Sequence, residues 1–123
     1  MSLLKSEAIM TLCFEMGYSD GEYSEEEIKS VCANPRFQET AGEFDWDLFS
    51  EKIKRGDANH ANAVSALKGC SLDTQIDALA FVWHVLLADG VMTDEEKDVM
   101  ARLLTEFDID IETVSNRLKV QIA

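Results

Sequence analysis

The chain has 123 residues, of which 46% are hydrophobic, and its acidic residues outnumber its basic residues to give a formal charge of −13 at pH 7. This length and apolar content suit a single domain, residues 1–123, with a hydrophobic core. The negative charge disfavours binding to nucleic acid or to an anionic membrane surface, and it favours cations or a basic protein partner.

The first two helices are predicted from apolar residues at helical spacing. Such a stripe predicts a helix over about residues 3–18, which an aspartate–glycine pair then ends. Ser24 begins a second helix, which stops near Pro35 because proline disfavours helix in the residue before it. Residues 37–42 are interpreted as a connector.

Two glycines and several candidate caps delimit the next two helices. The third is capped by Asp45 or Asp47 and ends at Gly56. The fourth is capped by Asp57 and ends at Gly69. An aromatic set at the start of the third helix favours core packing over a partner-binding stripe, since its members roughly share one helix face; it consists of Phe44, Trp46 and Phe49.

Three more helices complete the chain. The fifth begins at Ser71 or Asp73, and its apolar residues lie almost all round, which is typical of a helix in the middle of a fold. The sixth begins at Thr93, and the seventh runs from Asp110 to the C-terminus. No convincing alternating strand pattern occurs, so the predicted fold class is all-α with about seven helices.

A short acidic motif occurs twice, at residues 20–27 and 89–96, with the pattern D-G-x-x-[S/T]-acid-E-E. We call these stretches the two DG motifs. In each, glycine suits a helix end, the hydroxyl suits an N-cap, and the glutamate three residues later completes a capping box. The repeat predicts two similar helix–DG-loop–helix units.

Capping explains the two leading aspartates less well, because both precede the glycine. Carboxylates supply the oxygen ligands that hard cations prefer. Each motif alone fails the EF-hand spacing, which needs glycine at the sixth position and glutamate at the twelfth. A divalent metal site would therefore be shared between the motifs, through Asp20, Glu27, Asp89 and Glu96. Two capped, solvated helix corners without a metal are the alternative interpretation.

Residues 87–96, with the sequence LADGVMTDEE, resemble the "ADG…E" motif of the TerB-like family, and the resemblance covers essentially the whole chain. The family includes the tellurite-resistance protein TerB and the N-terminal domain of DjlA-type co-chaperones. The first motif departs from it, since Tyr18-Ser19 stands where the family usually has a small residue. The J-domain tripeptide His-Pro-Asp is absent from the sequence.

The resemblance implies an all-helical fold in which the two corners are related by a pseudo-two-fold axis. It also implies an acidic patch, proposed as a metal site, at Asp20, Glu27, Asp89 and Glu96. The resemblance further implies a role in tellurite and other stress responses, and it implies no enzymatic activity. The alternative function is a protein–protein interaction domain that uses its acidic surface and no specific metal.

No other constellation predicts catalysis. His84 lies on an apolar helix and is better explained as a core histidine than as a metal ligand. His60 is expected at the surface in the first turn of a helix, and no histidine pair suggests a zinc hydrolase. We therefore expect no enzyme activity.

Three cysteines without a C-x-x-C pair favour buried free thiols in a reducing cytoplasm. The N-terminus lacks the pattern of a signal peptide. The longest apolar stretch, residues 78–88, is too short to cross a bilayer. We expect a soluble cytoplasmic protein that does not insert into membranes.

Overall fold

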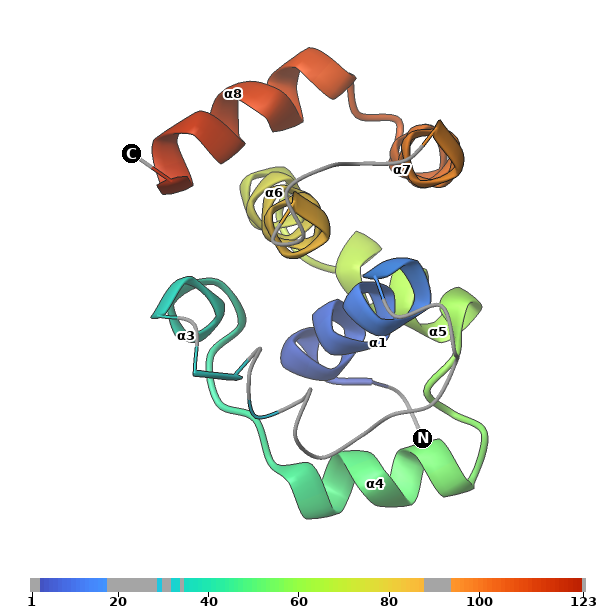
Figure 1. The fold of residues 1–123 in the computed structure, drawn as a ribbon. Helices are drawn as coiled ribbons and strands as arrows, with labels where there is room; N and C mark the ends of the chain where they lie inside the picture. Colours follow the sequence, from blue (N-terminus) through green and yellow to red (C-terminus); the bar gives the residue numbers. More distant parts are fainter. Residues whose placement is uncertain (1–2, 18–28, 30–31, 34, 88–93, 123) are drawn as a thin grey trace.

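The computed structural model describes residues 3–17, 29, 32–33, 35–87 and 94–122, and all the regular secondary structure within these ranges is α-helical (Figure 1). The all-α prediction is therefore confirmed. Seven helices are described: α1 (Lys5–Gly17), α3 (Pro35–Ala41), α4 (Trp46–Lys54), α5 (His60–Lys68), α6 (Leu72–Leu87), α7 (Asp94–Phe107) and α8 (Ile111–Ile122).

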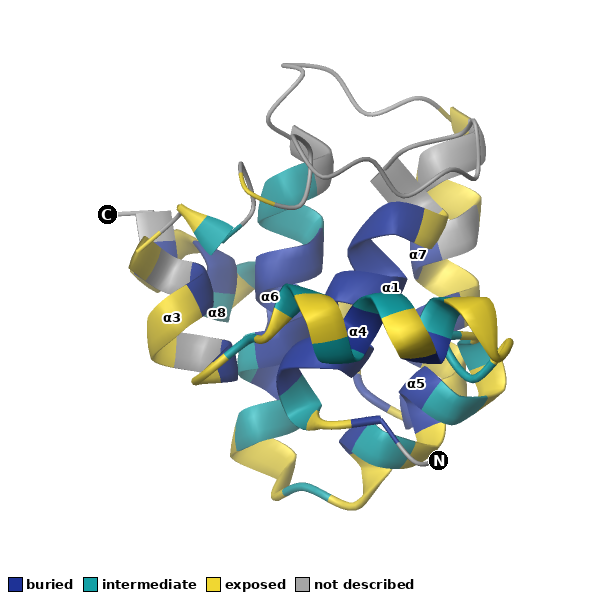
Figure 2. Ribbon diagram, turned by 90° about the horizontal axis from the view of Figure 1, so that it is seen from below, coloured by how far each residue is buried: buried dark blue, intermediate teal, exposed yellow. Residues whose placement is uncertain are grey.

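Helix α6 forms the middle of the fold, as its apolar pattern predicts. It packs against α1, α3, α5, α7 and α8, and Figure 1 shows it between α8 and α1. The five consecutive residues Ala78 to Val82 are all 0% exposed, so no side of this segment faces solvent. In α1, residues 6–14 are likewise buried without a break. These two helices supply the centre of the core in Figure 2.

The prediction of a connector over residues 37–42 is wrong, because residues 35–41 form α3. Pro35 is the first residue of this helix, where its fixed φ and missing N–H are tolerated. Phe37 and Ala41, four residues apart, are both buried, and the Phe37 ring lies 5.6 Å from that of Phe81 on α6. Gly42 then ends the helix with a φ of +81°. The predicted second helix, from Ser24, lies largely outside the described residues.

The caps of α4 and α5 resolve one alternative and correct one prediction. Asp45 caps α4, because its carboxylate accepts hydrogen bonds from the backbone N–H groups of Asp47 at 2.9 Å and Leu48 at 3.3 Å. Asn59 caps α5, and its side chain accepts from the backbone of Asn62 at 2.9 Å. The prediction that Asp57 is this cap is therefore wrong: α5 begins at His60, three residues after Asp57.

Replacing Asp45 by alanine is expected to destabilise the protein by about 1 kcal/mol, because two N–H groups of the first turn of α4 lose their acceptor. Urea denaturation measures this change. Asp45→Asn is the matched control, since asparagine caps as well as aspartate and should restore most of the stability. Equal losses in the two variants would contradict the capping role.

The last three helices begin close to their predicted starts. Ser71 lies at the start of α6, and its hydroxyl accepts from the backbone N–H of Thr74 at 3.2 Å. Helix α7 begins at Asp94, directly after Thr93, which itself lies outside the described residues. The Asp110 carboxylate accepts from the backbone N–H of Glu112 at the start of α8. None of the described helices is long and apolar enough to cross a membrane. The cytoplasmic location stays a prediction.

Candidate metal centre

Most of the predicted metal site lies outside the described residues. This is true of Asp20, Glu27 and Asp89, while Glu96 is in the first turn of α7 but its side chain is not among those described. Within the described ranges, no group of three or more His, Cys, Asp or Glu side chains is arranged to hold a metal ion. The four-carboxylate site and the pseudo-two-fold relation of the two corners therefore stay predictions.

The described helices next to the DG motifs are close to one another. The first motif follows α1, and the second follows α6 and runs into α7. Helix α1 packs against both α6 and α7, and α6 packs against α7. The C-terminal ends of α1 and α6 and the N-terminal end of α7 lie on the upper side of the molecule in Figure 2.

An ion-pair bridge between three helices is the first polar cluster that sequence reasoning missed. His60, the first residue of α5, places Nδ1 2.8 Å from Oε1 of Glu15 on α1. Its Nε2 lies 2.8 Å from Oε1 of Glu106 on α7. The expectation of a surface histidine is only partly right, since the side chain is 38% exposed. No local sequence signal connects residues about 45 positions apart, and this separation explains the omission.

The bridge favours the charged form of the histidine. Partial burial lowers the pKa of His60, but hydrogen bonds to Glu106 and Glu15, together with their charges, outweigh this and raise the pKa above its usual value. With both ring nitrogens protonated, each donates to a different carboxylate. The cluster is therefore an ion-pair bridge rather than a cation cage, because both sides of the ring are already occupied.

A buried ion pair joins α1 to α4. The Lys52 ammonium lies 2.6 Å from Oε1 of Glu7, and their side chains are only 5% and 1% exposed. The same carboxylate oxygen accepts the backbone N–H of Leu4 at 2.7 Å, so Glu7 also satisfies the start of α1. Burial of this kind is costly for single charges but tolerable for a paired and hydrogen-bonded set.

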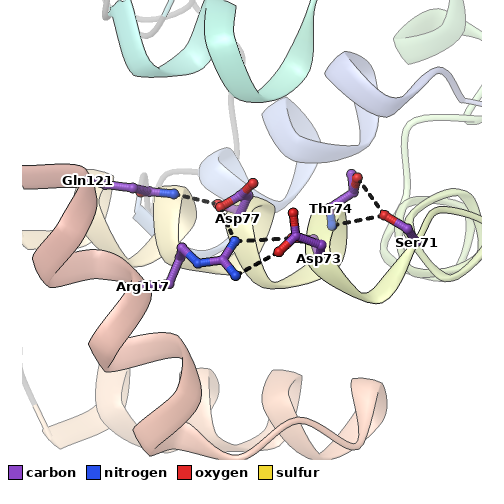
Figure 3. A network of polar contacts seen from close by, with 6 residues as sticks. All are labelled: Ser71, Asp73, Thr74, Asp77, Arg117 and Gln121. Atoms are coloured by element: carbon purple, nitrogen blue, oxygen red, sulfur yellow. Dashed lines mark hydrogen bonds and ion pairs between the residues drawn. The ribbon is translucent and has the colours of Figure 1, made fainter.

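A third cluster fixes α8 on α6 (Figure 3). Arg117 of α8 donates from Nη2 to Oδ1 of Asp73 at 2.7 Å and from Nη1 to Oδ1 of Asp77. Gln121 donates to the backbone carbonyl of Asp77 at 3.1 Å. Hydrogen bonds to Asp77 and Asp73 raise the pKa of Arg117. Because the arginine engages both carboxylates, this cluster joins two helices rather than forming a cation site.

The remaining candidates are packing residues in the described structure. His84 is half-buried and stacks on Phe81, with ring centroids 6.4 Å apart and planes at 10°. Phe49 is fully buried, while Phe44 and Trp46 pack against the core as partly buried residues, which agrees with the predicted core role.

The three cysteines are free thiols in the described structure. Cys13 is buried, while Cys32 and Cys70 are half-buried. Burial raises the pKa of Cys13 strongly and also raises the pKa of Cys32, so both thiols are poor nucleophiles near neutral pH. The expectation of a buried free thiol is met at Cys13, whereas Cys32 and Cys70 are free but only half-buried.

In the part of the chain that the structure describes, these observations define an all-helical fold whose polar clusters hold helices together. A family model described as "Tellurite resistance protein TerB" matches residues 6–117, nearly the whole chain. The chain therefore belongs to the TerB family, and the resemblance seen in the sequence is confirmed. No curated protein and no solved structure matches the chain.

Proposed function

We propose that this chain is a non-enzymatic TerB module that binds a divalent cation through both DG motifs, using Asp20, Glu27, Asp89 and Glu96. The observation that carries the proposal is the motif itself, which occurs twice in a chain that the TerB model matches over nearly its whole length. Helix capping accounts for the glycines and hydroxyls of the motifs and leaves the two aspartates available as ligands.

The charge and the neighbouring helices support a shared site. A formal charge of −13 favours cations over anions at the surface. The helix ends that adjoin the two motifs lie on one side of the molecule (Figure 2). Carboxylates from two motifs would supply the oxygen ligands that neither motif, with its non-EF-hand spacing, can arrange alone.

The family description connects this module with tellurite resistance, and we propose a role in the response to such stress. The proposed route is the binding of a metal cation rather than of tellurite. Tellurite is an oxyanion, and the strongly negative charge of the chain opposes its direct binding.

Thermal melts in Ca²⁺, Mg²⁺, Mn²⁺ and Zn²⁺ test the proposal. A metal present at about 100 times its dissociation constant should stabilise the fold by about 2.7 kcal/mol. Asp20→Asn and Asp89→Asn should each remove the shift, because the site needs both motifs. Asp98→Asn, an exposed carboxylate of α7 outside the motifs, is the control and should retain it. The proposal fails if no metal shifts the melt, or if both motif variants retain the full shift.

The second candidate is an interaction domain whose acidic surface binds a basic protein without a specific metal. Exposed carboxylates concentrated in a short stretch favour it, and they include Glu43, Asp45 and Asp47. Pull-down from native lysate in the presence of a chelator should recover partners that salt elutes, because exposed charge pairs are screened. Recovery of no salt-sensitive partner would contradict this candidate.

A further inference from the structure

A cleft of about 420 Å³ opens beside α3 and the segment that joins α3 to α4. Among the described residues it is lined by Cys32, Phe37, Gln38, Gly42, Glu43 and Phe44. Its volume lies in the range of sites that accept a ligand or an anchoring side chain. None of the polar clusters described above contributes to it, so the cleft is separate from the helix-joining ion pairs.

The aromatic wall of the cleft is held in place by the core. Phe37 and Phe44 meet edge to face, with centroids 6.1 Å apart and planes at 78°. Behind them, Phe37 packs on Phe81 at 5.6 Å and Phe44 packs on Phe49 at 5.4 Å. Such an arrangement holds the apolar surface in a fixed shape. Binding of a partner would therefore cost little conformational entropy in the side chains of the cleft.

The chemistry of the lining favours an apolar group that carries or adjoins positive charge. Burial raises the pKa of the Cys32 thiol, which therefore stays neutral and does not oppose an apolar occupant. Glu43 adds an exposed carboxylate at the cleft, and two more exposed carboxylates, Asp45 and Asp47, follow in the chain. An apolar pocket with a charged rim is the usual arrangement around an anchoring side chain at a protein interface.

We propose that this cleft docks a segment of a partner protein in which one apolar side chain is flanked by lysine or arginine. The apolar side chain enters against the half-buried Phe44, which the buried Phe37 supports from behind, and the basic residues face Glu43. The proposal rests on the second candidate function, since it specifies where a basic partner would bind. The charge of −13 accelerates the approach of such a segment and repels acidic ones.

Three labelled peptides of equal length test the proposal by fluorescence anisotropy in a buffer with EDTA, which removes divalent cations. The first has a leucine between lysines, the second has glycine in place of leucine, and the third has glutamates in place of lysines. The first should bind, the second should bind about tenfold more weakly or worse, and the third should not bind.

Matched variants locate the binding. Glu43→Lys should weaken the first peptide by about tenfold or more, because it reverses the charge at the cleft. Glu112→Lys makes the same change in net charge in the first turn of α8 and should have a much smaller effect. Both positions are exposed, so neither change disturbs the core. Equal effects of the two substitutions would overturn the cleft as the binding site.

A measurement on the unmodified chain complements these variants. Cys32 lines the cleft, whereas Cys70 is equally half-buried and lies outside it. Alkylation by iodoacetamide is followed by mass spectrometry at mildly alkaline pH, where more of each thiol is ionised. A saturating amount of the first peptide should slow the alkylation of Cys32 and leave that of Cys70 unchanged. Equal protection of both thiols, or of neither, overturns the proposal.

The outcomes separate the cleft from the broader functions. If the leucine and glycine peptides bind equally, the apolar side chain does not contribute to binding and the cleft proposal fails. The acidic surface alone would then account for the binding. The cleft proposal also fails if no peptide binds at protein concentrations up to about 1 mM, because any dissociation constant would then be weaker than about 1 mM. The metal proposal is tested independently by the thermal melts, because EDTA removes divalent cations from the peptide experiment.

Discussion

Replacing Lys52 by methionine is expected to destabilise the protein by about 3–5 kcal/mol, because the Glu7 carboxylate would stay buried without its counter-charge. Methionine retains the length and apolar stem of the lysine, so little of the loss would come from an empty space. Guanidinium chloride denaturation at neutral pH measures the change in the free energy of unfolding.

The double variant Glu7→Gln with Lys52→Met is the control. Glutamine keeps an oxygen that can accept the backbone N–H of Leu4, and no uncompensated charge remains. We expect this variant to recover most of the stability lost in Lys52→Met, since replacing both members of a buried pair is often nearly neutral. A double variant as unstable as the single one would show that packing, rather than charge pairing, dominates at this position.

The stability of the protein is expected to fall as pH rises above neutral, through the loss of the His60 bridge. The folded-state pKa of His60 is raised, so the bridge contributes fully below the unfolded value of about 6.5. Its contribution disappears as pH rises through the folded pKa. Two partly exposed ion pairs contribute roughly 0.4–2 kcal/mol in total, after allowance for solvent screening.

Comparison of the wild type with His60→Gln between pH 5.5 and 8.5 tests this expectation. At the acidic end the wild type should be more stable than His60→Gln. This difference in the free energy of unfolding should shrink as pH rises. An NMR titration of the His60 ring should give a midpoint above 6.5, which Glu106→Gln lowers and Glu112→Gln leaves unchanged. A pH-independent difference between the two proteins would contradict the bridge.

The fold class could be predicted because its signals are local. Apolar spacing defined the faces of the helices, and the all-round apolar pattern identified α6 as central.

Local signals also explain the errors in the predicted helix boundaries. Pro35 disfavours helix before it, and it can also begin a helix; the second role was missed, and the burial of Phe37 against Phe81 shows that α3 begins there. At α5, Asp57 and Asn59 both suit a cap, and only the hydrogen bond to Asn62 distinguishes them.

The polar clusters could not be predicted, because their members are far apart in sequence. Glu7 meets Lys52, and His60 meets Glu15 and Glu106, across separations of 45 or 46 residues. Helix periodicity gives the face on which each residue lies, but the pairing of faces depends on tertiary packing. The metal ligands were proposed from the repeat and the family resemblance, and they stay a prediction for the melts to test.

The central position of α6 has a consequence for the order of folding. Helices α5, α6, α7 and α8 follow one another closely in the chain, and α5, α7 and α8 all pack on α6. Helix α1 also packs on α5 and α6, but residues 18–59 separate it from them in the sequence. Because long loop closure costs entropy before its contacts form, the C-terminal helices should assemble first and α1 should dock late. Substitutions where α1 meets α4, including Lys52→Met, should then accelerate unfolding and leave the refolding rate nearly unchanged.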